Sequence, residues 1–246
     1  MQFRVQDAAS TLTPDEDEKN TILIMGIMSI VIAILWNLPY LNIILWPFKL
    51  VTVAFHEFCH AFMGIVTGAK VESIQIDPRL GKPRLCNLGG GGVTMLAGGI
   101  QCCTLPAGYM GSALIGSAMI FCAFDVMASK IAALCVAGLL VVTLFLARNF
   151  WAVFVTVIFI ALIGFFWWLN DGEFLVYLIM FLGVMSALYV AFDMLTELVL
   201  HQNYQSDATK FSKLCPSLSP KGWGFVWFIW SVLLVAVAIT AAIAVF

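Results

Sequence analysis

The sequence predicts an all-α polytopic membrane protein of about seven transmembrane helices, with a small β-hairpin-like insertion between the second and third. Composition is the first reason: the 246 residues are 62% hydrophobic and only 11% charged, whereas soluble domains carry roughly 25% charged residues. A single soluble core stops growing at about this chain length, so a water-soluble fold could not bury so much apolar surface. The second reason is a series of seven apolar runs, each near the ~20 residues that a helix needs to span a bilayer.

The elements follow in order along the chain. Residues 1–20 are polar and acidic, and we expect them to form a flexible cytoplasmic tail. They lack the basic start and apolar core of a cleavable signal, so the first apolar run is expected to act as an uncleaved signal-anchor. A single membrane-embedded domain is predicted over 21–246. Its apolar runs cover 21–37, 41–67, 105–124, 131–147, 149–168, 174–200 and 223–246.

The long polar connection over 68–104 does not have a helical pattern. Val71, Ile74 and Ile76 suit a short strand, and glycines bracket a second candidate strand over 93–96. Two interpretations remain open for this Gly-rich segment on the cytoplasmic side: a small hairpin that dips toward the membrane, or a flexible loop. Non-helical backbone is tolerated at membrane depth only where it lies against protein or water.

The distribution of charge predicts the orientation. Most Lys and Arg residues fall on one side of the predicted topology, with Lys130 almost alone on the other. The positive-inside rule makes the basic side cytoplasmic, which places the N-terminus in the cytoplasm and the C-terminus across the membrane. The sequence contains no basic patch with interleaved aromatic residues, so we expect no nucleic-acid partner.

Residues 56–60 read His-Glu-Phe-Cys-His, which is the H-E-x-x-H pattern, in the middle of an apolar run. On a helix, His56 and His60 lie on one face and can bind one metal ion, while Glu57 is placed to activate a water molecule as the catalytic general base. The chain has only three histidines, and two of them are in this motif. An ionisable side chain at mid-membrane costs free energy, so its presence there indicates a functional site. The alternative is a polar cluster that forms hydrogen bonds between helices.

A catalytic zinc ion takes three protein ligands and keeps one open position, so the motif needs a third ligand. Asp193 is the preferred candidate, because it lies in an apolar run at a depth that differs from that of His56 by only roughly 6 Å at 1.5 Å per residue. Asp207, in the following loop, is the second choice, although Ser206-Asp207-Ala208 could simply cap a short helix. Glu197 lies one turn beyond Asp193 and could orient a ligating histidine or stand at the interface.

These residues resemble the site-2-protease family of intramembrane zinc metallopeptidases, and most closely its B-like branch. The stretches that carry the resemblance are 54–61, 67–68, 98–99, 105–112, 193 and 206–208. The resemblance implies a Zn²⁺ cofactor, peptide-bond hydrolysis within or beside the bilayer, and an Asp third ligand from a later helix, which maps best to Asp193. The better-known members carry Gly after that Asp, whereas Met194 follows here.

Two functions are therefore compared. The first is a zinc endopeptidase that cuts transmembrane or membrane-proximal substrates, with membrane proteins and the lipid bilayer as its partners. The alternative is a non-hydrolytic carrier of metal or protons, or a degenerate scaffold, that uses the same His, Glu and Asp cluster. The two differ at Glu57, which a protease needs for chemistry and a carrier does not. A seven-span receptor is disfavoured, because it gives no reason for H-E-x-x-H at mid-membrane.

Overall fold

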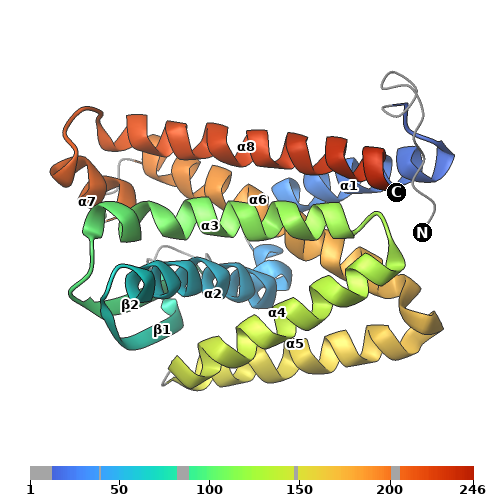
Figure 1. Cartoon of the computed structure of the whole chain (residues 1–246), viewed down its shortest axis with the longest axis horizontal. Helices are drawn as coiled ribbons and strands as arrows, with labels where there is room; N and C mark the ends of the chain where they lie inside the picture. The colour runs from blue at the N-terminus through green and yellow to red at the C-terminus, as the bar shows by residue number, and fades with distance from the viewer. Residues whose placement is uncertain (1–12, 39, 82–88, 147–148, 201–205) are drawn as a thin grey trace.

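The computed structural model describes residues 13–38, 40–81, 89–146, 149–200 and 206–246, with the backbone alone for 77–81, 89–90 and 194–200. Seven long helices and a two-stranded antiparallel hairpin form the molecule, which confirms the predicted fold class (Figure 1). The elements are α1 (Glu16–Asn37), α2 (Asn42–Val66), β1 (Lys70–Gly81), β2 (Gly89–Ala97), α3 (Gln101–Cys122), α4 (Val126–Leu146), α5 (Phe150–Trp168), the 3₁₀ turn η1 (Leu169–Gly172), α6 (Glu173–Leu200), α7 (Asp207–Leu214) and α8 (Pro220–Val245).

Local sequence signals explain where two of these helices begin. α1 starts at Glu16, inside the predicted tail, because Asp15 and Glu18 form a capping box in which each side chain accepts a hydrogen bond from the other residue's backbone N–H. α5 and α6 are separated at Asn170-Asp171-Gly172, where all three residues have positive φ. This left-handed stretch ends one helix and lets the next run back beside it, as expected of a turn.

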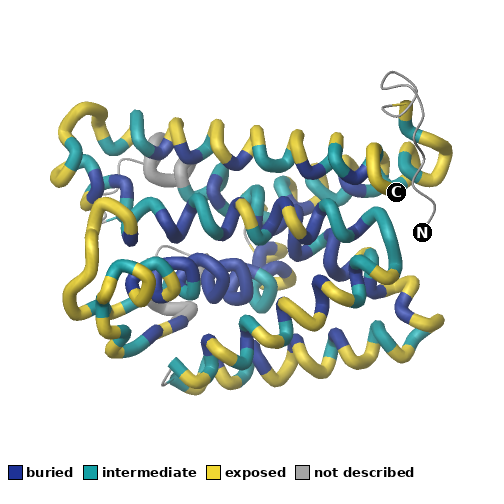
Figure 2. Tube along the Cα trace, viewed as in Figure 1, coloured by how far each residue is buried: buried dark blue, intermediate teal, exposed yellow. Residues whose placement is uncertain are grey.

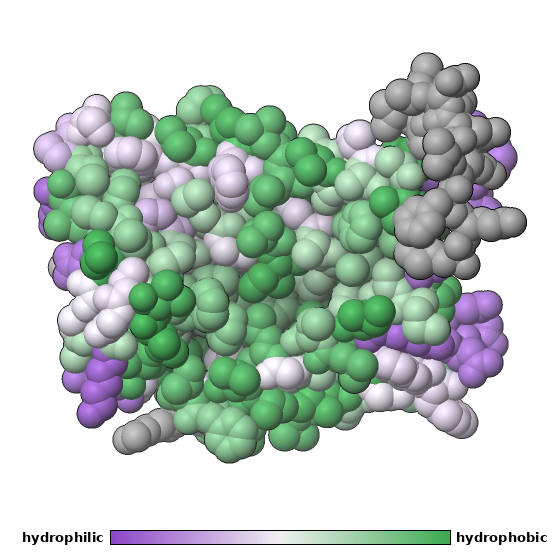
Figure 3. Space-filling model, in the orientation of Figure 1, coloured by the Kyte–Doolittle hydropathy of each residue, from purple (hydrophilic) through white to green (hydrophobic). Residues whose placement is uncertain are grey.

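Six segments are long and apolar enough to cross a membrane, and one of them, Phe150–Asp193, contains the two antiparallel helices α5 and α6. The seven predicted apolar runs therefore correspond to seven helices. The outer helices expose their apolar side chains: only 11% of the apolar window of α1 and 17% of that of α8 are buried. Figure 3 shows apolar groups across the middle of the visible face and hydrophilic groups gathered at its two ends, as a bilayer requires.

α2 is the central helix. Its apolar window is 72% buried, although it is the least apolar of the six candidate spans. Figure 2 shows it as an almost continuous buried segment in the interior of the bundle. It also buries polar side chains, among them Asn42, Lys49 and Thr52, and the Lys49 ammonium lies 3.9 Å from the centre of the Trp36 ring on α1.

Small residues let α3 pack closely against α6. A Cβ added to Gly116 would lie 2.9 Å from the carbonyl oxygen of Gly183, and the reverse holds for a Cβ added to Gly183. Ser186 on α6 donates a hydrogen bond to the carbonyl oxygen of Ser112, 2.9 Å away. Small residues at these positions therefore let the two helices approach closely.

The ends of the bundle differ from the predicted topology. The first turns of α1 line a pocket through Met25, together with Ile120 near the end of α3 and Ile239 near the end of α8. α1 thus begins at the end of the molecule where α8 finishes (Figure 1). The described chain begins and finishes at the same end, and not at opposite ends as predicted.

The direction of α2 explains this difference. α1 ends with Trp36 stacked on Phe192, near the end of α6. Leu45, near the start of α2, belongs to the same hydrophobic cluster as Ile120, and α2 then leads to the hairpin. Both helices therefore run toward the hairpin end, where α7 and its lysines also lie (Figure 1). These lysines gather at the hairpin end, whereas α1 begins at the opposite end. The basic end and the N-terminal end of the described chain therefore cannot both be cytoplasmic, as the sequence predicted.

Candidate metal centre

The H-E-x-x-H residues lie in the middle of α2 and are almost completely buried. His56, Glu57 and His60 expose 5%, 5% and 7% of their surfaces. Their positions four residues apart on one helix bring the two Nε2 atoms within 3.0 Å of each other. The two rings meet edge to face, with centroids 4.6 Å apart. α2 thus directs two imidazole nitrogens at one point inside the bundle.

Asp207 on α7 completes the group. Its Oδ2 lies 3.1 Å from His56 Nε2 and 2.9 Å from His60 Nε2. Asp207 is the first residue of α7, and Ser206 caps that helix by accepting a hydrogen bond from the Thr209 backbone N–H at 3.1 Å. The cap fixes the start of the helix, and with it the direction of the carboxylate. Among the described residues, His56, His60 and Asp207 form a group whose ligand atoms lie within 4.8 Å of one another and could hold a metal ion.

Electrostatics at Asp207 favour its charged form. Burial by itself would raise the pKa of this carboxyl, but its interactions with His60 and His56 more than offset that effect and hold the pKa well below its ordinary value. Lys210, one turn along α7, places its Nζ 3.7 Å from Oδ1. Asp207 is therefore a carboxylate, the form that binds metals.

The hydrogen bond of His60 assigns its tautomer. Its Nδ1 lies 2.7 Å from the backbone carbonyl oxygen of Thr104, a group that can only accept, so Nδ1 carries the proton. The Nε2 lone pair of a neutral ring is then directed at the Asp207 carboxylate and at His56. Two acceptors at 2.9 Å repel each other unless a cation or a proton lies between them. The donor set thus fits a bound cation, and the Thr104 carbonyl is the kind of outer partner that orients a ligating histidine.

α3 leaves space over the two imidazoles because Gly108 has no side chain. A Cβ at this position would lie 2.6 Å from both Nε2 and Cε1 of His56, and closer still to Nε2 of His60. The next residue, Tyr109, packs its ring edge to face on His56 with centroids 4.6 Å apart. Gly108 therefore keeps the convergence point of the three donor atoms open.

Glu57 is covered by the hairpin. Strand β2 runs antiparallel to β1, with Ile74 opposite Thr94 and Ile76 opposite Gly92. The Thr94 hydroxyl lies 2.6 Å from Glu57 Oε2 and donates a hydrogen bond to it. The insertion predicted as either a hairpin or a loop is therefore a hairpin, and it packs against the motif.

Comparison with known proteins decides the family. The Peptidase M50B-like family matches residues 27–238. The chain belongs to this family. The match covers all four residues His56, Glu57, His60 and Asp207, and it confirms the resemblance to the B-like branch of the site-2-protease family. No curated protein and no solved structure matches the chain significantly.

Membership and structure together establish the broad class of the molecule. The described part of the M50B-like chain has six candidate membrane spans, and the chain belongs to a family of peptidases, so it is an integral membrane protein with a peptidase fold.

Asp193, the preferred third ligand, does not join the group that His56, His60 and Asp207 form in this M50B-like protein. Its carboxylate accepts a hydrogen bond from the Tyr109 hydroxyl. Because the Tyr109 ring packs on His56, Asp193 lies one side chain further away from the histidines. Asp193 and His56 were expected at a similar depth along the membrane normal, but depth does not fix which neighbour a side chain meets. The side chain of Glu197 lies outside the described residues.

Three contributors to the site were not identified from the sequence of this M50B-like chain: the Thr104 carbonyl, Gly108 as the open face above the histidines, and Thr94. A backbone carbonyl leaves no sequence signal. A single glycine within a helix, such as Gly108, does not reveal what it faces. The run of glycines before Thr94 is compatible with close approach of the backbone to a neighbour, and at Gly92 that neighbour is Glu57.

Proposed function

We propose that this chain is a zinc-dependent intramembrane endopeptidase that hydrolyses peptide bonds of transmembrane or membrane-proximal substrates. The observation that carries the proposal is the convergence of His56, His60 and Asp207 beside Glu57, inside the most buried helix of a membrane protein from a peptidase family. Donor atoms around tetrahedral zinc lie about 3.3 Å apart when each is ~2.0–2.1 Å from the metal. The three separations here are 3.0, 3.1 and 2.9 Å, close to that value.

Each residue has a distinct role in the proposal. His56 and His60 supply two nitrogen ligands and Asp207 supplies one oxygen ligand, which leaves the fourth position open. Zinc bound in such a site acidifies a water molecule and polarises the scissile carbonyl. Glu57 takes a proton from the attacking water and later returns it to the nitrogen of the leaving amine.

Substrates must present an extended backbone, because the peptide groups of an intact transmembrane helix are hydrogen-bonded internally. The hairpin supplies a surface for such a segment, by addition of a strand along β2. Asn149, the N-cap residue of α5, supports this choice of strand. Its side-chain amide donates a hydrogen bond to the backbone carbonyl oxygen of Ile76, so this β1 carbonyl already has a partner. Val93 and Met95 project from the face of β2 opposite to that of Thr94, and both are exposed.

The proposal is tested by paired measurements of zinc and cleavage. Detergent-purified wild type is expected to hold about one zinc ion per chain and to cut members of a panel of single-span peptides that carry a fluorophore and a quencher. Glu57→Gln is expected to keep its zinc and lose cleavage, whereas His56→Ala loses both. Unchanged cleavage by Glu57→Gln, or a wild type that never carries zinc, would refute the peptidase and favour a carrier or an inactive scaffold.

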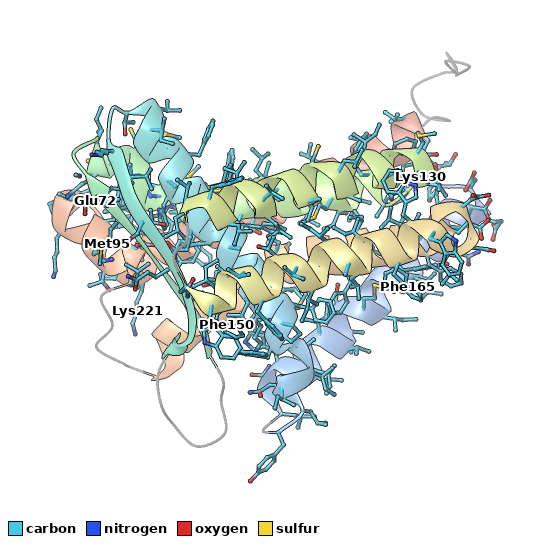
Figure 4. All side chains as sticks on the ribbon, turned by 90° about the horizontal axis from the view of Figure 1, so that it is seen from below. Glu72, Met95, Lys130, Phe150, Phe165 and Lys221 are labelled. Atoms are coloured by element: carbon cyan, nitrogen blue, oxygen red, sulfur yellow. The ribbon has the colours of Figure 1, made fainter. Side chains whose placement is uncertain are left out.

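The orientation is proposed from the charges. The hairpin end carries Lys70, Lys210, Lys213 and Lys221. Among the described residues, the other end carries Lys19 and Lys130, together with acidic residues that include Asp125, Asp171 and Glu173. Figure 4 shows Lys221 and Lys130 at opposite ends. The positive-inside rule then makes the hairpin end cytoplasmic and puts both termini across the membrane.

Glycosylation mapping tests this orientation. Asn-x-Ser acceptor sites added before Met1 and after Phe246 are both expected to be glycosylated in microsomes. A matched acceptor in the connection between α7 and α8 is expected to stay unmodified. Modification of that connection alone would reverse the orientation, and modification of only one terminus would contradict their common side.

A further inference from the structure

Strand β2 is shaped to the side chain of Glu57 in two independent ways. Thr94 donates to Glu57 Oε2 at 2.6 Å, and the same hydroxyl lies 3.1 Å from the Glu57 backbone carbonyl. Two residues earlier, Gly92 packs its backbone against the same side chain: a Cβ at Gly92 would be 2.4 Å from Cγ, 2.5 Å from Oε1 and 2.7 Å from Cδ of Glu57. One strand therefore binds one oxygen of the carboxylate and packs closely against the rest of the side chain.

The position of β2 is fixed by its partner strand β1. Ile74 and Ile76, opposite Thr94 and Gly92 on β1, are fully buried in the main hydrophobic cluster. Asn149 holds the Ile76 carbonyl from α5. Because a shift of one residue would turn the inner face of a strand outward, this burial fixes the register that directs Thr94 and Gly92 at Glu57.

We infer that Thr94 is the positioning residue for Glu57: its hydroxyl holds Oε2, so that Oε1 is the oxygen that receives the proton of the attacking water. The inference rests on the proposed function. A glutamate side chain has three rotatable bonds, and a catalytic group must be held within about 0.5 Å of its productive position to be effective. The hairpin thus serves as the element that orients the base, in addition to any contact with substrate.

The test compares variants that keep or remove the hydroxyl. Thr94→Val has nearly the same shape but no donor, and Thr94→Ser keeps the donor. We expect Thr94→Val to lower kcat about 10- to 100-fold, the usual loss when an outer partner of a catalytic centre is removed, with KM and zinc content close to wild type. Thr94→Ser is expected to restore kcat to within about threefold of wild type. Each is measured with the peptide of the panel that wild type cuts fastest.

A second variant and a control separate positioning from folding. Gly92→Ala would press a methyl group against Cγ and Oε1 of Glu57 and displace the carboxylate, so it is expected to lower kcat with zinc retained. Thr67→Val is the control: the Thr67 hydroxyl donates to Met63 at the end of α2 and accepts from the Ile100 backbone N–H after the hairpin, without touching Glu57. Its kcat is expected to stay within about threefold of wild type.

The outcomes are distinguishable. Cleavage that survives Glu57→Gln would overturn the proposed function, and this inference with it. If Glu57→Gln is inactive but Thr94→Val keeps the kcat of wild type, only the positioning role fails. It also fails if Thr94→Ser loses as much activity as Thr94→Val, or if Thr94→Val loses its zinc, because the hydroxyl would then support packing or the metal ligands.

Discussion

Asp207→Asn is expected to abolish zinc binding and to reduce kcat/KM by more than about 100-fold, the upper end of the loss seen when only an outer partner of a metal ligand is removed. The change keeps the shape of the side chain and removes its charge. Oδ2 of Asp207 lies between the two imidazoles, at 3.1 and 2.9 Å from their Nε2 atoms. A neutral amide at this point is a poor zinc ligand, because zinc in proteins is bound by thiolate, imidazole and carboxylate groups.

Asp193→Asn is the matched variant. The same chemical change at Asp193 leaves an oxygen that can still accept the hydrogen bond of Tyr109, so zinc content is expected to stay near that of wild type. Metal analysis of both purified variants, with cleavage assays on the same preparations, decides between the two aspartates. Loss of zinc from Asp193→Asn with retention in Asp207→Asn would restore Asp193 as the third ligand.

Gly108→Ala is expected to displace the metal and to stop cleavage. In most helices this substitution would be favourable by about 1 kcal/mol, because alanine has the higher helix propensity. Here the new methyl group would lie 2.6 Å from Nε2 of His56 and nearer to Nε2 of His60, on the two nitrogen atoms proposed as metal ligands. Either the imidazoles turn away or α3 shifts, and both changes separate the three ligands.

The control is Gly138→Ala on α4, where a Cβ would have no neighbour within 4 Å. We expect its zinc content and kcat to match wild type. Thermal unfolding in detergent shows whether Gly108→Ala still folds, since overpacking of a core costs about 1–3 kcal/mol. A folded Gly108→Ala that binds zinc and cuts as wild type does would mean that α3 is not as close to the histidines as the structure has it.

Much of the fold was predictable because hydropathy reports directly on lipid contact. The seven apolar runs became seven helices, and the connection over 68–104 became the hairpin. The direction of α1 was not predictable: the charge rule assumes that successive runs cross the membrane in alternation, whereas α1 and α2 both run toward the hairpin. That arrangement depends on how Leu45 and Ile120 pack, which no single run of sequence encodes.

The candidate site also contains residues that a local pattern predicts and one residue whose place depends on the whole fold. The two histidines and Glu57 follow from one local pattern, because their geometry is set by a single helix. Asp207 comes from a short helix 147 residues after His60, and its placement depends on the fold of everything between them. Ser206 gave a local signal for the start of that helix, but a cap does not reveal what the capped helix faces.

The buried position of α2 has a consequence for how the protein is made. A helix leaves the translocon for the bilayer when its apolar groups outweigh its polar ones, and each charged residue at its centre costs about 2.5–3.5 kcal/mol on the insertion scale. α2 carries Lys49, His56, Glu57 and His60 and is the least apolar candidate span, so its own sequence favours insertion weakly. We therefore expect its entry into the membrane to depend on α1 before it and α3 after it, so that the helix with the H-E-x-x-H motif is committed to the bilayer only together with its neighbours.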